Sequence, residues 1–342
     1  RGLVGSEMCI RDRYRSGPEP SRQEIDYWLQ KELQRPDKVA FLRKCLKNMH
    51  DRTTEADYFN ARVFAEAIRW LEQNQDADQF FLTVESFDPH EPWFVPESYR
   101  RLYDDGDGPQ HVISGYADTS QLSPELLRRT RANYSGLVTM CDRWFGFFYE
   151  KLLRMGLLDE TLLIVTSDHG HSIGDKAYMG KRGYPSDPSV FDVPVFIRHP
   201  EGLGAGRRTG AIIQHHDLTA EMLHFAGIEP AGRLDGMPVF EKALRGEPLR
   251  DHATVGWGST VTVVSADWHM NCKVDGSGPF LYDLSAESPY ERNLAGENPE
   301  LVAQLFAVAV EDAGGGYPEY LMELARNQKD APGCSALAAR PS

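Results

Sequence analysis

Residues 162–165 are four consecutive apolar residues, and Thr166-Ser167-Asp168-His169-Gly170 follows them directly. A short apolar run with polar neighbours is typical of a buried strand. In open α/β sheets, functional side chains gather beyond the carboxyl ends of such strands. The segment therefore predicts an α/β fold whose site includes Asp168 and His169, although the same residues taken alone would also suit an ordinary turn.

Two further apolar segments lie close to residues with useful side chains. Residues 80–87 predict a strand, and Asp88-Pro89-His90 follows it directly. Gly180 and Lys181 come after the strand at 162–165, and residues 193–198 predict another strand. The strands that end near 87 and 167 thus each deliver a histidine, and a lysine follows the later one.

The rest of the first 250 residues alternates predicted helices with loops. Residues 54–57 resemble a capping box, and apolar residues then recur at helical spacing from Val63 to Leu71. Helices are also predicted near 39–48, from Ser123-Pro124 through Leu152, and from Asp217 as N-cap to Gly227. Segments 96–122 and 171–192 are poor in apolar residues, so we expect surface loops there.

The pattern changes beyond Arg250. Short β-like runs at 254–255, 261–264, 270–274 and 280–284 precede a predicted helix over 299–312. We therefore expect residues 251–342 to form a small C-terminal α+β subdomain, an antiparallel sheet with a packed helix and a frayed tail from Gly314. Residues 14–250 are expected to form the main α/β domain. Residues 1–13 lack a helical or strand period and a signal-peptide core, and we expect them to be a non-native remnant.

Composition excludes several classes of partner and site. The formal charge of −14 argues against binding to nucleic acid or to an anionic membrane, because both need Lys and Arg to neutralise phosphates. Hydrophobic residues make up 41% of the chain, enough for a core, and no run approaches the ~18 apolar residues of a membrane span. The five cysteines include no Cys-x-x-Cys pair, which indicates free thiols.

Taken together and in this order, the motifs resemble those of the sulfatases of the alkaline phosphatase superfamily. The matching elements are Pro89-His90-Glu91-Pro92, Thr166-Ser167-Asp168-His169-Gly170, Gly180-Lys181, Val193-Pro194-Val195, and Leu281-Tyr282-Asp283-Leu284 with Glu291-Arg292-Asn293-Leu294. The resemblance spans roughly residues 55 to 310. It implies an alkaline phosphatase-like α/β fold with a mainly parallel central sheet flanked by helices.

The resemblance also implies roles for individual residues. Asp168 and His169 would be metal ligands, and His90 and Lys181 would act on the sulfate and its leaving oxygen. His171 would face the substrate, a small-molecule or carbohydrate sulfate ester. Calcium is the implied ion, and because calcium prefers oxygen ligands to histidine, magnesium or manganese stays open.

Four weaker candidates lie near these motifs. Trp93 and Tyr184 are expected at the wall of the substrate pocket, and His215 and His216 are expected to be structural. Lys176 stands where the family often has a histidine, which puts a role for the 175–176 pair in doubt.

The family's nucleophile motif is missing from the sequence. In sulfatases a Cys or Ser is followed by Pro two positions later and Arg four positions later, and it is converted to formylglycine. Ser16 and Ser186 come closest, but Pro20 and Val190 stand where the arginine belongs. We therefore expect an incomplete catalytic domain that lacks the formylglycine segment and an acidic pair of metal ligands, and a chain that is inactive alone.

Three functions remain open on the sequence alone. The first is a sulfuric ester hydrolase. The second is a phosphodiester or phosphonate monoester hydrolase of the same superfamily, because the same side chains would serve phosphoryl oxygens. The third is a non-catalytic member that binds a sulfated ligand, against which the joint presence of His90, Asp168, His169 and Lys181 argues.

Overall fold

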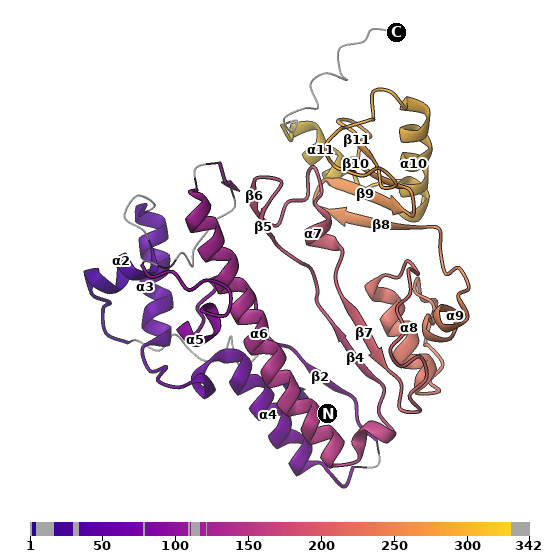
Figure 1. Ribbon diagram of the computed structural model, residues 1–342. Helices are drawn as coiled ribbons and strands as arrows, with labels where there is room; N and C mark the ends of the chain where they lie inside the picture. The colour runs from indigo at the N-terminus through magenta and orange to yellow at the C-terminus, as the bar shows by residue number, and fades with distance from the viewer. Residues whose placement is uncertain are drawn as a thin grey trace. The chain divides into compact units, whose positions relative to one another are not determined.

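The computed structural model describes residues 2–4, 17–29, 34–77, 79–108, 110, 117–120 and 122–329. The chain divides into two compact units (Figure 1). Unit 1 comprises Arg1–Glu160 and Ile173–Gly180, and unit 2 comprises Thr161–Ser172 and Lys181–Ser342. The domain boundaries expected at residues 13 and 250 stay predictions.

Unit 1 is mainly helical. Its helices are α2 (Arg22–Trp28), α3 (Pro36–Met49), η2 (Glu55–Asp57), α4 (Phe59–Gln73), α5 (Glu97–Arg100), α6 (Pro124–Arg154) and η3 (Leu157–Asp159). Its strands are β1 (Gly2–Val4), β2 (Leu82–Val84), β3 (Ala117–Asp118), β6 (Tyr178–Gly180) and β5 (Ser172–Asp175), which begins at the unit boundary. β1 runs parallel to β2, and β3, β6 and β5 form a second small sheet.

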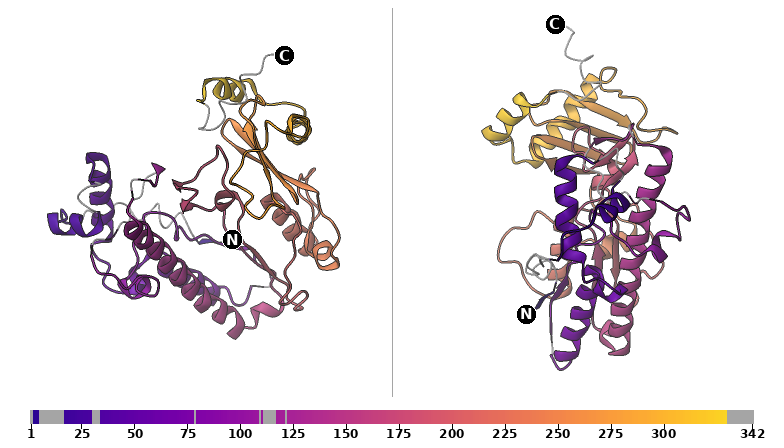
Figure 2. Two further views of the ribbon diagram at one scale, coloured as in Figure 1. Left: turned by 45° about the horizontal axis from the view of Figure 1, so that its top comes forward. Right: turned by 90° about the vertical axis from the view of Figure 1, so that its left-hand side faces the viewer.

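The long helix predicted after Ser123-Pro124 is confirmed as α6. The Ser123 side chain accepts the backbone N–H of Leu126, and Pro124 occupies the first turn, where its missing N–H costs nothing. α6 lies alongside α4 (Figure 2), and Phe64 of α4 stands 6.0 Å from Phe148 of α6 between ring centroids. This pair of helices carries much of the core of unit 1 because its facing apolar stripes bury each other.

The capping box predicted at 54–57 is also confirmed, and it begins η2 directly before α4. Oδ2 of Asp57 accepts the backbone N–H groups of Thr54 at 2.7 Å and Thr53 at 2.9 Å. These backbone hydrogen bonds, with the two threonine hydroxyls, lower the pKa of Asp57 to about 2. The carboxylate therefore satisfies backbone donors that would otherwise lack a partner at this helix start.

The segment 96–122 was predicted to be a surface loop, and that prediction is wrong. It contains α5, and Arg100 and Asp104 are buried. Asp104 pairs with Arg129 of α6, and its Oδ1 also lies 3.3 Å from Nη2 of Arg128. Arg129 further donates to the carbonyls of Asp107 and Gly108. The sequence pattern missed this because charged residues are rarely buried unless they are paired, and the pairing partners lie far along the chain.

Unit 2 contains a two-stranded and a four-stranded sheet. Its strands are β4 (Leu163–Thr166), β7 (Val195–Arg198), β8 (His252–Trp257), β9 (Thr260–Ser265), β10 (Trp268–Lys273) and β11 (Phe280–Asp283). Its helices are α7 (Pro188–Phe191), α8 (His215–Phe225), α9 (Phe240–Arg245), α10 (Pro299–Asp312) and α11 (Glu319–Asn327). β4 and β7 pair antiparallel, with Ile164 opposite Ile197.

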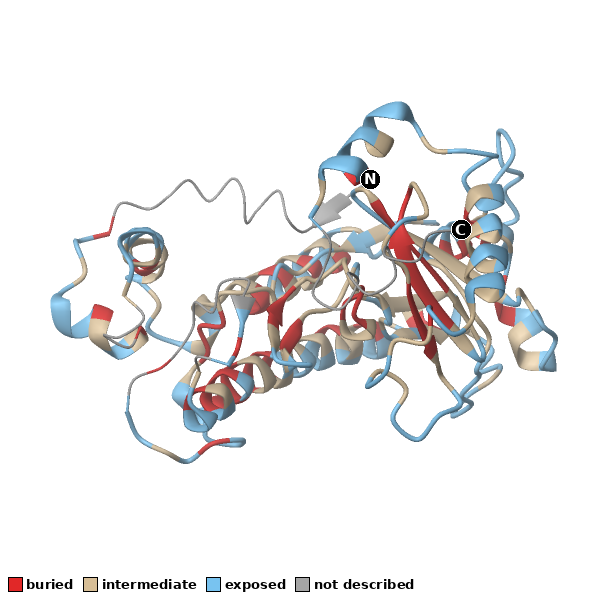
Figure 3. Ribbon diagram, turned by 90° about the horizontal axis from the view of Figure 1, so that it is seen from above, coloured by how far each residue is buried: buried red, intermediate tan, exposed pale blue. Residues whose placement is uncertain are grey.

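The predicted C-terminal antiparallel sheet with a packed helix is confirmed, with strand order β11-β10-β9-β8. Figure 3 shows buried residues along the strands of this sheet. Side chains of β9, β10 and β11, among them Val263, Met270 and Leu281, pack against apolar residues of α10. The α/β class is therefore confirmed. The expected mainly parallel central sheet is not found among the described strands, where β1 pairs in parallel with β2 but β4 and β7 pair antiparallel.

Several local predictions need correction. Segment 171–192 is not a plain loop, since β5 and β6 form a hairpin whose two turn residues, Lys176 and Ala177, both have positive φ. α8 begins after Gln214, and Asp217 at the third helical position accepts the N–H of Gln214.

Three elements fall where no regular structure was expected. β1 lies within residues 1–13, and α11 lies within the tail predicted to be frayed. α2 begins with a capping box between Ser21 and Glu24 that the charged composition of this region concealed. In α11, the fully buried Ala325 shows that tertiary packing orders a helix that composition alone disfavoured. No helix in the described part of the chain is long and apolar enough to cross a membrane.

We predict that Asp57→Asn lowers the melting temperature at neutral pH and flattens the acid side of the stability profile. The folded pKa of Asp57 lies below the unfolded value of about 3.9, so its contribution is present above pH 4 and is lost as the pH falls through about 2. Thermal unfolding from pH 2 to 6 measures this difference. Asp76→Asn, at an exposed position in the same unit, should change neither the melting temperature nor its dependence on pH. Equal effects of both variants would contradict the capping role of Asp57.

We predict that Asp104→Asn costs about 3–5 kcal/mol in the free energy of unfolding, because it leaves the buried guanidinium of Arg129 without its carboxylate. Urea unfolding measures the loss. The exposed neighbour Asp105 supplies the control Asp105→Asn, for which we expect a change within about 0.5 kcal/mol. A loss below about 1 kcal/mol for Asp104→Asn would rule out a structural role for this pair.

Candidate functional site

The turn after β4 carries Asp168 and His169, and local hydrogen bonds fix its shape. Oγ of Ser167 donates to the carbonyl of His169 at 2.8 Å, and the backbone N–H of His169 donates to Oδ1 of Asp168 at 2.8 Å. The N–H of Gly170 donates to the carbonyl of Val190 at 2.7 Å. A Cβ on Gly170 would stand 2.0 Å from the carbonyl oxygen of Ser189, so only glycine permits this close approach.

The structure brings the Asp168 and His169 side chains together. Nε2 of His169 lies 3.5 Å from Oδ2 of Asp168, and the Asp168 side chain is 83% exposed. Nδ1 of His169 lies 3.0 Å from the carbonyl oxygen of Gly170, which can only accept. Nδ1 therefore carries the hydrogen, and in the neutral ring Nε2 presents a lone pair beside the carboxylate. This is the donor set that a cation would use.

The two other predicted site histidines are held in the same way. Nδ1 of His90 lies 2.6 Å from the carbonyl of Glu91, and Nδ1 of His171 lies 2.8 Å from the carbonyl of Ser172. Each of the three rings thus donates from Nδ1 to the carbonyl of the residue that follows it. The backbone therefore sets the ring orientation and the tautomer of all three histidines, and Nε2 of His171 is buried.

Lys181 directly follows β6, and its residue is half-buried. Gly180 precedes it with φ of +123°, a conformation that residues with a Cβ rarely adopt. The backbone conformation therefore explains why a glycine precedes Lys181. Lys181, Asp168, His169 and His171 all belong to unit 2.

His90 belongs to unit 1, in the loop after β2. Its ring stacks on Phe87 with 4.4 Å between ring centroids, and its backbone N–H donates to the carbonyl of Phe87 at 2.9 Å. The flanking Asp88-Pro89 and Glu91-Pro92 bonds are both cis. His90 is therefore held by contacts within its own loop.

Sequence reasoning missed Asp88, the residue two positions before His90. Oδ2 of Asp88 accepts the backbone N–H of Asn60 at 3.1 Å. Burial raises the pKa of Asp88, while that hydrogen bond and the charges of Arg52 and His90 act in the opposite direction. The guanidinium of Arg52 in turn lies over the rings of Tyr58 and Phe59. The sequence signal that could have indicated Asp88 was an acidic residue directly before the Pro-His element.

One of the weaker predictions fails, one fits, and the expected place of Tyr184 in a pocket wall stays a prediction. Trp93 is only 1% exposed and its indole N–H donates to the carbonyl of Pro89 at 3.0 Å, so its placement in a pocket wall was wrong. The hydroxyl of Tyr184 donates to the carbonyl of Gly278, and the ring packs against Phe280. His215 lies 2.8 Å from the carbonyl of Ser167, a structural contact as predicted.

No group of three or more His, Cys, Asp or Glu side chains in the described residues gathers closely enough to hold a metal ion. Asp168 and His169 thus offer two ligands, fewer than a complete calcium or magnesium shell requires.

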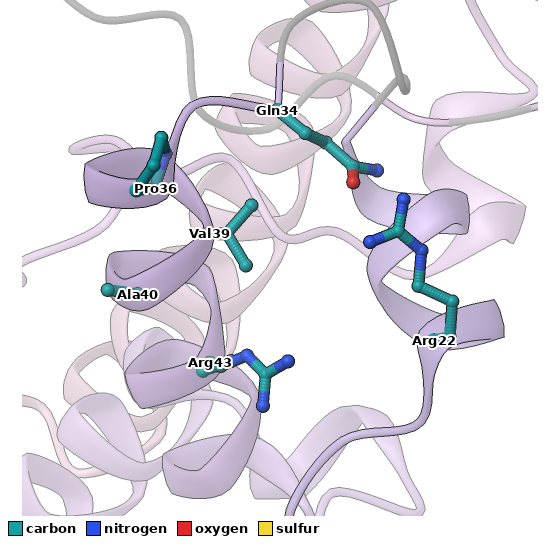
Figure 4. Close-up of a pocket in the computed structure, with 6 residues that line it drawn as sticks. All are labelled: Arg22, Gln34, Pro36, Val39, Ala40 and Arg43. Atoms are coloured by element: carbon teal, nitrogen blue, oxygen red, sulfur yellow. The ribbon is translucent and has the colours of Figure 1, made fainter.

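Unit 1 contains a pocket near its N-terminal helices. It lies between α2 and α3, has a volume of about 420 Å³, and is lined by Arg22, Gln34, Pro36, Val39, Ala40 and Arg43 (Figure 4). Arg22 pairs with Asp26 at 3.0 Å and Arg43 with Glu19 at 3.2 Å, so both guanidinium groups already have carboxylate partners. None of the predicted site residues lines it.

Known proteins of similar sequence and fold point to one family. An arylsulfatase of Clostridium perfringens is 27% identical over 192 residues, which cover 51% of this chain and 40% of the arylsulfatase. A solved phosphonate monoester hydrolase of Agrobacterium radiobacter has a TM-score of 0.63 at 24% identity, covering 81% of this chain and 62% of that one. The chain thus spans less than two thirds of either relative.

A second solved structure, a protein in complex with its substrate D-glucosamine-2-N,6-O-disulfate, has a TM-score of 0.63 at 16% identity and covers 80% of this chain and 72% of that one. These likenesses confirm the fold expected from the sequence motifs. Residues 13–228 match the model of the family described as Sulfatase. The chain belongs to the sulfatase family of the alkaline phosphatase superfamily.

Proposed function

We propose that the protein to which this chain belongs is a sulfuric ester hydrolase that cleaves a small-molecule or carbohydrate sulfate ester at a divalent-metal site. The observation that carries the proposal is the Asp168–His169 pair, whose Oδ2 and Nε2 atoms lie 3.5 Å apart at the carboxyl end of β4. Family membership supports it, as does the fold shared with a protein whose substrate is a sulfated glucosamine.

Asp168 and His169 fit one side of a metal shell. The exposed carboxylate keeps Oδ2 beside the lone pair of Nε2, so both can bind one ion. Calcium is the ion we propose, with magnesium or manganese as alternatives because imidazole suits softer cations. The ion would withdraw electron density from the sulfuryl oxygens. The remaining ligands and the formylglycine nucleophile are proposed to come from a segment outside this sequence.

Lys181 would act on the sulfate group of the ester, and His90 would act on its leaving oxygen. The ammonium of Lys181 acts as a point charge on the developing negative charge of the sulfate. Nε2 of His90 is the ring nitrogen that can hold a proton for the leaving oxygen, because Nδ1 is used by the carbonyl of Glu91. His171 is proposed to contact the substrate from the turn after Gly170.

The second candidate function is phosphonate or phosphodiester hydrolysis. The solved phosphonate monoester hydrolase favours it, because 81% of this chain is covered at a TM-score of 0.63. A third, non-catalytic binding of a sulfated ligand would need the same lysine and metal pair but no nucleophile.

We predict that Asp168→Asn lowers the affinity of this chain for Mn²⁺ at least about 10-fold, because it removes the charged oxygen ligand beside His169. Isothermal titration calorimetry with Mn²⁺ and Ca²⁺ measures the affinity. Asp175→Asn, at the end of β5, is the control and should bind as tightly as the unmodified chain. Unchanged binding by Asp168→Asn would remove Asp168 from the metal site.

We predict no turnover of 4-nitrophenyl sulfate or phenyl phosphonate by this 342-residue chain, since it carries no formylglycine motif. In the full-length parent, Lys181→Ala should lower kcat about 10²–10³-fold, as expected for one lost oxyanion contact. Lys176→Ala, in the β5–β6 turn, should leave kcat unchanged.

The substrate classes are separated by kcat/KM of the parent. A higher value for the sulfate supports the sulfatase, and a higher value for the phosphonate supports the alternative. Turnover by the chain alone would contradict the proposed missing nucleophile.

A further inference from the structure

One face of the C-terminal sheet is polar although it is buried. Side chains alternate along β9 and β10, so Val261, Val263, Met270 and Cys272 form the apolar face. The opposite face presents Thr260, Thr262, His269, Asn271 and Lys273, and each of these residues is at most 5% exposed. Buried polar groups cost free energy unless they have hydrogen-bond partners.

The partner of this polar face is the segment 183–187 of the same unit. The backbone N–H of Ser186 donates to Oδ1 of Asn271 at 3.0 Å. Oγ of Ser186 lies 2.8 Å from Nε2 of His269 and accepts from Oγ1 of Thr262 at 2.8 Å. The segment is therefore fixed by side chains of two neighbouring strands.

The hydrogen bonds in this cluster have one consistent direction. Nδ2 of Asn271 donates to Oγ1 of Thr262 at 3.0 Å, and Thr262 donates its hydroxyl hydrogen to Ser186. The hydroxyl hydrogen of Ser186 is then available to Nε2 of His269 at 2.8 Å, and we assign the tautomer in which this nitrogen is the acceptor. Nδ1–H of His269 faces the hydroxyl of Tyr290 at 3.4 Å.

The same segment continues to the turn that carries the metal-ligand pair. Oδ1 of Asp187 accepts the backbone N–H of Ser189 at 3.0 Å and its hydroxyl at 2.9 Å, which begins α7. Oγ of Ser189 lies 2.8 Å from Oγ of Ser172, and the carbonyl of Val190 accepts the N–H of Gly170 at 2.7 Å. Figure 1 shows α7 between the β4–β7 pair and the C-terminal sheet.

A Ser–His pair at 2.8 Å could also suggest a nucleophile and its base. Ser186 is 8% exposed and His269 is fully buried, with the ring of Phe191 edge-on at 5.3 Å between centroids. The hydroxyl of Ser186 is already engaged by Thr262 and His269. A substrate has no open approach to this oxygen, so the pair is a structural contact.

We propose that His269 is a positioning residue for the functional site. Through Ser186 it holds the segment 182–192, and through Val190 and Ser189 that segment holds Gly170 and Ser172 beside Asp168 and His169. Lys181 directly precedes the same segment. The inference rests on the proposed function in taking Asp168 and His169 as the metal ligands; the hydrogen-bond path itself does not depend on it.

The test compares two substitutions of His269 in the full chain. His269→Gln keeps an acceptor near the position of Nε2, whereas His269→Phe keeps a ring and removes the acceptor. Hydrogen–deuterium exchange of peptides covering 168–175 and 186–192 reports the position of the segment, and Mn²⁺ titration reports the metal-ligand pair. Val263→Ala, on the apolar face of the same sheet, is the control for general destabilisation.

We expect His269→Phe to speed exchange in both peptides and to weaken Mn²⁺ binding about 10-fold or more, the effect of losing a group that orients a ligand. His269→Gln should restore most of both values, and Val263→Ala should leave Mn²⁺ binding unchanged. If His269→Phe does not fold, Ser186→Ala removes the same contact by deleting only the hydroxyl oxygen. We then expect the same faster exchange and weaker Mn²⁺ binding.

Unchanged exchange and unchanged Mn²⁺ affinity in His269→Phe, or in Ser186→Ala where the former does not fold, would overturn the proposal. Equal losses in His269→Phe, His269→Gln and Val263→Ala would also overturn it, because they would reflect lost stability alone. Faster exchange in His269→Phe together with unaltered Mn²⁺ binding in Asp168→Asn would support the positioning path and overturn the proposed metal site.

Discussion

The buried polar face of the C-terminal sheet is the constraint on which unit 2 depends. Thr262, His269 and Asn271 can stay buried only because Ser186 and its neighbours accept and donate the hydrogen bonds that water would otherwise supply. The segment that satisfies them is therefore as fixed as the sheet. Because that segment also accepts the N–H of Gly170 and hydrogen-bonds the hydroxyl of Ser172, the position of the site turn follows from packing against the C-terminal sheet.

The histidines of the candidate site are prepared by a simpler device. In His90, His169 and His171, Nδ1 donates to the carbonyl of the next residue, so the backbone itself chooses the tautomer. Each of these hydrogen bonds joins two neighbouring residues, so the local backbone contributes to the orientation of the ring. Sulfate and phosphonate esters both present tetrahedral oxygens, so the roles proposed for the lysine and the histidines apply to either substrate.

Much of the fold could be predicted because its signals are local. Ser123-Pro124 begins α6, Thr54 and Asp57 form the capping box, and the apolar run ending at Val165 is β4. Two of the failures share one cause, namely a partner far along the chain. Asp104 is buried only because Arg129 neutralises it, and Trp93 is core only because the residues around Tyr134 and Leu137 of α6 cover it. Composition in a window contains neither partner.

The sequence by itself determined the family and the α/β class and singled out Asp168, His169, Lys181 and His90 as candidates, because motif order and strand periodicity are properties of neighbouring residues. Only the tertiary structure decided which atoms of those residues face each other and what holds them. Oδ2 of Asp168 lies 3.5 Å from Nε2 of His169 because of the direction that the backbone takes after β4. Ser186 contacts His269 because buried polar groups need hydrogen-bond partners. These two effects arise when strands pack, and no short stretch of sequence encodes them.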